Sequence, residues 1–255
     1  MAKILYVYND QVYANITNKC DCNCTFCIRK QFDGVGDADT LWHKAEPSLS
    51  EIIAAIDAFD FTGYKEFVFC GYGEPICALE NLIASARYVK EKTGLPIRVN
   101  SNGLGNLYYK RDIVPQLAEV VDSISISLNE ATAEKYEKVT RPSFPHAYEA
   151  MLDFAEECGK LIPHTQLSIV DILPEEDIKA CQRIAEPRCP SESTSMGAQC
   201  IKKLPFSCLP VSTSGITVPA HPEGSVHLSF VSVDAVIPHL PGGYGYSASA
   251  GPDLH

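Results

Sequence analysis

Short apolar runs alternate with longer amphipathic stretches between residues 11 and 186. The runs have strand length and are rich in Val, Ile, Phe and Tyr, which is typical of strands that are buried or half-buried. They fall at residues 3–8, 11–17, 66–70, 96–100, 123–128 and 166–171. The first two runs flank Asn9 and Asp10, and they predict a hairpin or an edge strand that leads into the first core strand.

The stretches between these runs carry apolar residues at helical spacing. Ser48 and Glu51 form a capping-box pattern at the start of the first helix. Pro115 limits the predicted helix at residues 112–120 to a late start or a kink. After the first, the predicted helices are residues 79–92, 112–120, 131–139, 146–158 and 175–186.

Strands that alternate with helices predict an α/β fold with a parallel sheet and right-handed crossovers. The pattern contains about six β/α units. A closed barrel of this type needs about eight. We therefore expect a curved partial (β/α)6 barrel that occupies residues 1–186.

The chain changes character after residue 186. Residues 187–255 hold nine of the seventeen prolines and only seven charged residues, and no amphipathic period persists. Such a stretch buries too little apolar surface to offset the entropy of ordering. We expect a low-order, disordered tail, or an out-of-frame ending. Cys189, Cys200 and Cys208 are therefore poor candidates for ligands.

Four cysteines, Cys20, Cys22, Cys24 and Cys27, lie within eight residues after the second predicted strand. Cysteines this close cannot all form disulfides without strain. Short loops rich in thiolates instead bind zinc or iron–sulfur clusters. Cys20, Cys24 and Cys27 form a Cys-x3-Cys-x2-Cys set that suits a [4Fe–4S] cluster with one open iron. The alternative is a zinc knot that uses all four cysteines.

The cysteine spacing resembles that of the radical S-adenosylmethionine (SAM) superfamily, in which three cysteines hold three irons and SAM chelates the fourth. The resemblance covers about residues 15–186. It implies that Cys20, Cys24 and Cys27 are the cluster ligands. Cys22 does not fit the triplet, and we interpret it as a spare thiol that points away.

A second signature, Gly71-Tyr72-Gly73-Glu74-Pro75, follows the strand at residues 66–70. It resembles the Gly-Gly-Glu-Pro motif that holds the amino group of SAM, although Tyr72 separates the two glycines. Further motifs resemble the family at the ends of later strands. The SAM-binding residues that the resemblance implies are Phe26, Gly71, Gly73, Glu74, Asn100, Ser101, Ser127 and Val170. Strand alternation sends only one of Asn100 and Ser101 inward.

One predicted strand has an apolar face and a hydroxylic face. Ser123, Ser125 and Ser127 alternate there with apolar residues. A sheet covered by helices on both sides should be apolar on both faces. The serine face therefore suggests a cavity. Arg141 is a candidate anion contact or a solvated side chain, and Trp42 is interpreted as packing.

The net charge of −11 opposes nucleic-acid binding. No apolar run has the length of a membrane span, and the first residues do not resemble a signal peptide. We expect a cytoplasmic enzyme with a [4Fe–4S] cluster and SAM as cofactors, an electron donor such as flavodoxin or ferredoxin, and a substrate that the sequence does not name. The layout is most similar to the TatD-associated radical SAM proteins. A glycyl-radical-enzyme activase and a non-catalytic iron–sulfur or zinc-binding protein are the alternatives.

Overall fold

The computed structural model of the chain describes residues 2–170, 173–185 and 201–204. All of these residues belong to one unit, Met1–Val211. A second unit, Ser212–His255, lies wholly outside the described residues. The predictions for Cys189, Cys200 and Cys208 also fall outside them.

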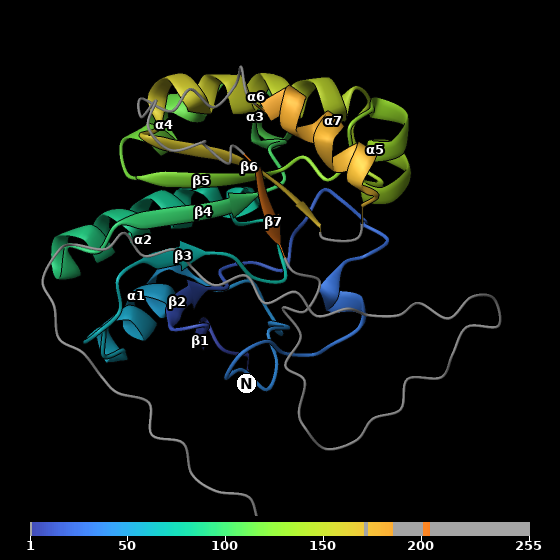
Figure 1. The fold of residues 1–255 in the computed structure, drawn as a ribbon. Coiled ribbons are helices and arrows are strands. Elements are labelled where there is room, and N and C mark those ends of the chain that lie inside the picture. Colours follow the sequence, from blue (N-terminus) through green and yellow to red (C-terminus); the bar gives the residue numbers. More distant parts are fainter. Residues whose placement is uncertain (1, 171–172, 186–200, 205–255) are drawn as a thin grey trace, which may run out of the picture. The chain divides into compact units, whose positions relative to one another are not determined.

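Within the described residues, seven strands form one open sheet in the order β1-β2-β3-β4-β5-β6-β7 (Figure 1). β1 runs antiparallel to β2, and the later neighbours are all parallel. The predicted hairpin is confirmed, with positive φ at Asn9 and Asp10, as a tight two-residue hairpin turn requires. Five of the predicted strands are confirmed as the parallel strands β2–β6, and β7 brings the parallel part of the sheet to six strands. The strands are β1 (Leu5–Tyr8), β2 (Gln11–Ala14), β3 (Phe67–Phe69), β4 (Ile97–Ser101), β5 (Ser123–Ser127), β6 (His164–Val170) and β7 (Ile201–Leu204).

The position of β7 corrects one part of the sequence interpretation. This strand lies inside the range assigned to a low-order tail, yet it pairs in parallel with β6 from Leu167 to Val170. β6 would otherwise leave a row of backbone groups unpaired at the sheet edge. Four residues between proline-rich stretches carry too weak a pattern to predict such a strand. The prediction for the rest of residues 187–255 stays a prediction.

The helices follow the predicted order, with shifted ends. The capping box of α1 is confirmed, because the Ser48 side chain accepts from the Glu51 backbone and the Glu51 carboxylate accepts from the Ser48 backbone. Pro115 lies in the first turn of α4. Proline is tolerated there because the backbone N–H groups of the first turn have no partner within the helix. Short elements η1, η2 and α3 were not predicted. The helices are α1 (Leu49–Ala58), α2 (Leu79–Thr93), α3 (Gly105–Tyr109), α4 (Val114–Ala118), α5 (Ala133–Thr140), α6 (Ala147–Leu161) and α7 (Glu175–Ala185), with the 3₁₀ turns η1 (Ile28–Lys30) and η2 (Pro75–Ala78).

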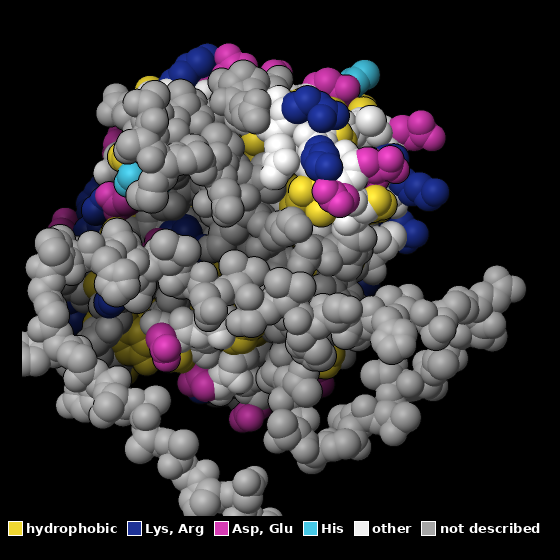
Figure 2. All heavy atoms as spheres, viewed as in Figure 1, with side chains coloured by type: hydrophobic (Ala, Val, Ile, Leu, Met, Phe, Trp, Pro, Cys, Tyr) yellow, Lys and Arg dark blue, Asp and Glu magenta, His cyan; other side chains and the backbone are white. Residues whose placement is uncertain are grey.

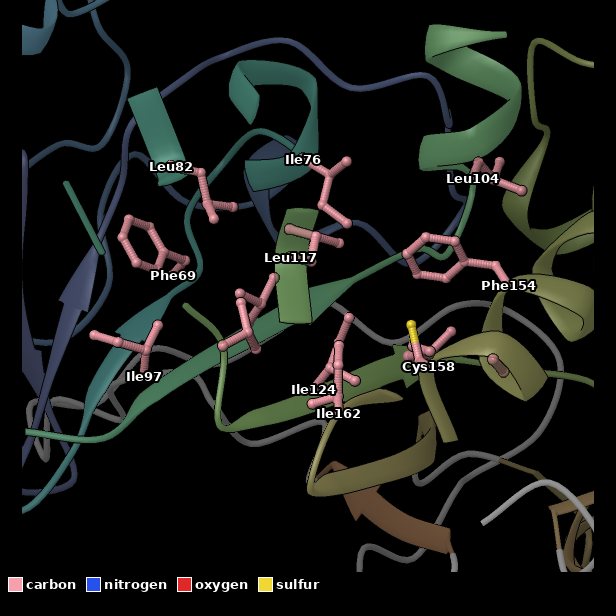
Figure 3. Close-up of a cluster of buried hydrophobic side chains, with 14 of the residues drawn as sticks. Phe69, Ile76, Leu82, Ile97, Leu104, Leu117, Ile124, Phe154, Cys158 and Ile162 are labelled. Carbon is pink, nitrogen blue, oxygen red and sulfur yellow. The ribbon is translucent and has the colours of Figure 1, made fainter. Parts of the chain in front are cut away.

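The hydrophobic core lies between the sheet and these helices. Figure 3 shows Phe69, Ile97 and Ile124 from the strands together with Phe154 of α6. All four side chains are at most 1% exposed. Burial of each side chain of this size stabilises the fold by about 1.5–3 kcal/mol. The core therefore fixes the helix-covered face of the sheet and leaves the other face to different residues.

The opposite face of the sheet is polar, as the serine pattern predicted. Register places Arg98 beside Ser123, and Asn100 beside Ser125. Arg98 is buried, and its Nε lies 2.8 Å from Glu66 Oε2 while its Nη2 donates to Gln11 at 2.8 Å. Arg98 is the second residue of β4, so polar side chains occupy the inner face from near the start of this strand as well as at its end.

The outer surface over α5 and α7 carries both signs of charge. Lys135 pairs with Asp177 across the two helices, and Lys179 pairs with Glu175 within α7. Figure 2 shows dark blue and magenta side chains interspersed in the coloured region at the upper right. That region therefore has no single-sign patch to steer a highly charged partner.

Candidate functional site

The cysteine loop starts directly after β2 and lies near the ends to which the parallel strands point. In Figure 1 it is part of the blue segment beside the arrowheads of β4 and β6. Functional sites of parallel α/β folds form at this end of the sheet. Cys20, Cys24 and Cys27 are half-buried, whereas Cys22 is buried at 5% exposed.

Two basic side chains hold the cysteine loop by its backbone. The Arg29 guanidinium donates to the carbonyl of Cys22 at 3.3 Å and to the carbonyl of Tyr72 at 3.3 Å. Lys30 Nζ donates to the carbonyl of Cys24 at 2.7 Å. These contacts satisfy backbone oxygens that the irregular loop cannot pair internally. They also bring two positive charges next to the thiols.

Residues 15–18, which precede the first cysteine, are anchored on the segment at residues 41–46. Asn15 is fully buried and its Nδ2 donates to the Leu41 carbonyl at 2.7 Å. Thr17 donates to Glu46 at 2.5 Å, and Asn18 Nδ2 donates to the His43 carbonyl at 2.7 Å. These hydrogen bonds therefore hold residues 15–18, and with them the start of the cysteine loop, against residues 41–46.

The two glycines of the second motif, Gly71 and Gly73, lie against the residues that precede Cys20. A Cβ on Gly71 would lie 2.2 Å from Asn15 Oδ1, and a Cβ on Gly73 would lie 2.3 Å from the Thr17 carbonyl oxygen. Glycine is the residue that permits such close approach. Close approach to Asn15 thus explains Gly71, and close approach to the backbone of residues 17 and 19 explains Gly73.

Tyr72 is the residue at which this motif differs from that of the family, and its side chain makes contacts of its own. It is 4% exposed and belongs to a small cluster with Tyr6 and Leu41. Its hydroxyl donates to the Phe32 carbonyl, and its ring meets the ring of Trp42 edge-on at 5.2 Å. Tyr72 therefore ties the glycine motif to the return of the cysteine loop, and Trp42 packs there although it is 38% exposed.

A buried polar network links three loops of the site. Glu74 accepts from the backbone of Asn102 at 2.7 Å and from the backbone of Ile76 at 3.2 Å. The Asn102 side chain donates to Asp21 Oδ1 and approaches Cys22 Sγ at 3.6 Å. Hydrogen bonds between polar side chains and backbone therefore join the loops after β2, β3 and β4.

The buried network changes the acidity of its members. Burial raises the pKa of Glu74 to about 7, and Asp21 adds to the rise. Burial also raises the pKa of Asp21. The pKa of Cys20 rises to about 12 through burial and the nearby Glu74 charge. Cys24 differs, because a hydrogen bond from Cys22 lowers its pKa. The site thus favours neutral acids and one readily ionised thiol.

The raised pKa of Glu74 predicts how the metal-free protein responds to pH. The carboxyl binds its proton more tightly when folded, so this stabilisation is complete below pH 4.5 and is lost as pH rises to about 7. A rise of this size corresponds to about 3 kcal/mol. Urea unfolding of the metal-free protein between pH 5 and pH 7.5 should show the loss, and Glu74→Gln should remove it. Equal pH slopes for the two proteins would contradict the assignment.

The remaining residues predicted to bind SAM fall on two faces. Asn100, Ser127 and Val170 are half-buried on the inner face of the sheet. Ser101 lies on the opposite face, 3% exposed, and its Oγ accepts from the Gly103 backbone at 3.0 Å. Alternation thus sends Asn100 inward. Phe26 is half-buried in the cysteine loop, and Arg141 is exposed at the end of α5.

The thiols of the cysteine loop are of the donor type that iron–sulfur clusters use. No three His, Cys, Asp or Glu side chains in the described part of the chain converge on one point where a metal ion could bind. Tetrahedral zinc requires such convergence. A [4Fe–4S] cluster does not, because each cysteine binds a different iron.

Sequence reasoning missed the residues that assemble the site. Asn15, Asp21 and Asn102 make the contacts between loops. In the sequence, Asn102 precedes Gly103, and an Asn-Gly pair is equally typical of a simple turn. The one local signal is that Asp21 directly follows Cys20, and the partner of Asp21 lies 81 positions away. No pattern of spacing predicts a pair so distant in sequence.

The open parallel sheet with a thiol loop at the ends of its strands defines an α/β partial-barrel class of protein. The family model of the radical SAM superfamily matches residues 14–186. The chain therefore belongs to the radical SAM superfamily, whose members in the comparisons below are enzymes. No helix in the described residues has the length and apolar character needed to cross a membrane.

Known proteins resemble parts of this chain. A GTP 3',8-cyclase of Lactiplantibacillus plantarum is 27% identical over 135 residues, which are 52% of this chain and 37% of that protein. The chain thus spans little more than a third of the length of this curated relative. A radical SAM methyltransferase structure from Sphaerobacter thermophilus has a TM-score of 0.53 at 15% identity, covering 71% of this chain and 55% of that one. Methylornithine synthase (PylB) has a TM-score of 0.51 at 14% identity, covering 78% and 55%.

Proposed function

We propose that the chain is a radical SAM enzyme in which Cys20, Cys24 and Cys27 hold a [4Fe–4S] cluster and SAM binds next to it. The observation that carries the proposal is the placement of three half-buried thiols beside the Gly71–Glu74 loop at the ends of the parallel strands. The backbone of Glu74 donates to the Lys19 carbonyl at 2.7 Å, one residue before Cys20. The two motifs are therefore directly joined.

When bound, the cluster supplies an electron that breaks the carbon–sulfur bond of SAM and yields methionine and a 5'-deoxyadenosyl radical, which removes a hydrogen atom from the substrate. The protein binds, orients and excludes water. Phe26, Gly71, Gly73, Glu74, Asn100, Ser101, Ser127 and Val170 remain the proposed SAM site. Asn100, Ser127 and Val170 support it by sharing the inner face, and Gly71, Gly73 and Ser101 shape the loops around it.

Several finer features belong to the same proposal. The electron donor is a low-potential carrier such as flavodoxin or ferredoxin, because the cluster must be reduced before it acts. The compartment is the reducing cytoplasm, where such thiols persist. The motif layout favours the TatD-associated subgroup.

Two alternative functions differ in what they predict for SAM. An activase for a glycyl-radical enzyme would also cleave SAM, with a protein backbone as the substrate. A non-catalytic iron–sulfur or zinc-binding protein would not cleave it. The contact of the glycine motif with the cysteine loop favours the enzymatic alternatives, because a simple metal knot does not require it.

The experiment is anaerobic reconstitution followed by incubation with SAM and dithionite. We expect about four irons per chain and release of 5'-deoxyadenosine in step with methionine. Omitting dithionite is the control and should stop the release. Tight zinc binding without any SAM cleavage would replace this proposal with the non-catalytic alternative.

A further inference from the structure

The cysteine loop carries positive charge although the chain as a whole is acidic. Residues 19–31 hold three cations, Lys19, Arg29 and Lys30, and one acid, Asp21, which is buried. Lys19 and Lys30 are exposed. The whole chain has a net charge of −11. The loop that holds the half-buried thiols is therefore a local region whose charge is opposite to that of the protein.

The end of α5 brings a further cation, Arg141, to this loop. The backbone N–H of Asn23 donates to the Thr140 carbonyl at 3.0 Å and to the Arg141 carbonyl at 3.2 Å. The backbone N–H of Thr25 donates to the Val139 carbonyl at 2.8 Å. Asn23 and Thr25 are themselves exposed. The C-terminal end of α5 is therefore joined to an exposed part of the cysteine loop (Figure 1).

Arg141 is held in place by its backbone, whereas its side chain has no partner within the described residues. It caps α5 in the left-handed conformation, with φ of 47°, where glycine is the usual residue. The next residue, Pro142, forms a β-bridge with Cys22 of the loop. The side chain of Arg141 is exposed, and neither an ion pair nor a hydrogen bond joins it to another residue of the described part. Its guanidinium is therefore free to contact another molecule.

Lys30 places a second cation at the same exposed part of the loop. Its Nζ donates to the Cys24 carbonyl at 2.7 Å and to the Asn23 carbonyl at 3.3 Å. The exposed acids that lie nearest in the sequence are Asp33 and Glu137, and neither forms an ion pair within the described ranges. Their charges are therefore not bound to the cations of the loop.

We propose that Lys30 and Arg141, together with the exposed residues 23–25, form the docking surface for an acidic electron-carrier protein. The inference rests on the proposed function, in which a carrier reduces the cluster. Opposite charges steer two proteins together and orient them before contact. An acidic chain would otherwise repel an acidic carrier. The cationic surface instead attracts the carrier to the loop whose cysteines are the proposed cluster ligands.

The test is anaerobic reduction of the reconstituted full-length protein by reduced flavodoxin, followed by the absorbance of the cluster. Flavodoxin gives up one electron and is oxidised, and the cluster gains that electron. At low salt, we expect Arg141→Glu to lower the second-order rate constant roughly three- to tenfold. The difference should shrink at high salt, which screens exposed charges. Arg141→Lys keeps the charge and should stay close to wild type.

Two controls separate docking from other effects of the substitution. Dithionite is a small reductant that needs no docking surface, and it should reduce the clusters of wild type and Arg141→Glu at the same rate. Lys65→Glu makes the same change in net charge at an exposed residue near the start of β3, at the opposite end of the strands. Lys65→Glu should reduce the flavodoxin rate little or not at all.

A binding measurement tests the surface without the cluster. The metal-free full-length protein should bind oxidised flavodoxin, and Arg141→Glu should weaken this binding by a similar factor while Lys65→Glu does not. Equal flavodoxin rates in wild type and Arg141→Glu overturn the inference. An equal loss in Lys65→Glu, or an equal loss with dithionite, also overturns it. If flavodoxin binding depends on Arg141 but SAM is not cleaved, the proposed function fails while this inference stands.

Discussion

Cys24→Ala is expected to abolish the cluster: bound iron should fall from about four atoms per chain to fewer than one, and 5'-deoxyadenosine release should fall to background. Cys24 has a lowered pKa because Cys22 donates to it, and Lys30 and Arg29 add to the effect. Its thiol therefore ionises more readily, and the thiolate is the form that binds iron. Iron analysis and visible absorbance after anaerobic reconstitution measure the result.

The matched control for this prediction is Cys181→Ala. That thiol is equally free of disulfides and fully buried, but it lies in α7. It should keep the full iron content. A Cys24→Ala protein that still binds about four irons would show that other residues hold the cluster.

Gly73→Ala is expected to cost more than an ordinary glycine substitution. The added methyl would lie 2.3 Å from the Thr17 carbonyl oxygen and 2.7 Å from the Lys19 carbonyl oxygen. Both are backbone atoms that cannot swing aside, so the segment that leads into Cys20 must move. We expect a loss of about 2–3 kcal/mol in urea unfolding and markedly weaker SAM binding.

Gly63→Ala is the control for Gly73→Ala, because it introduces backbone strain without a steric clash of the added methyl group. Its added methyl meets nothing within 4 Å, although its φ of +87° disfavours alanine. The backbone term alone is about 1–2 kcal/mol. Gly63→Ala should keep wild-type SAM binding. If Gly73→Ala matches it in both stability and SAM binding, the close packing of the two loops is not required.

The fold was largely predictable because its signals are local. The strands β2–β6 lie in short runs rich in apolar residues, and the helices between them carry their own helical period. β7 escaped prediction because four residues between prolines are recognised as a strand only through their pairing with β6. α3 was missed for a similar reason, since five residues are too few to show a period.

The site was predictable only as far as its motifs. The cysteines and the Gly71–Glu74 loop stand out by spacing, whereas their supports depend on long-range contacts. Tyr72 looked like a deviation, and only its packing with Leu41 and its bond to Phe32 show its structural use. Asn102 looked like a turn residue, and its role depends on Asp21 being beside it in space.

The EPR spectrum of the reduced, reconstituted protein with and without SAM tests the central claim most directly. In the proposed site, three cysteines leave one iron available to SAM. Adding SAM should therefore change the spectrum of the [4Fe–4S] cluster, and a SAM analogue labelled at its amino or carboxylate group should show coupling to the cluster. A fully assembled cluster whose spectrum is identical with and without saturating SAM would contradict the account.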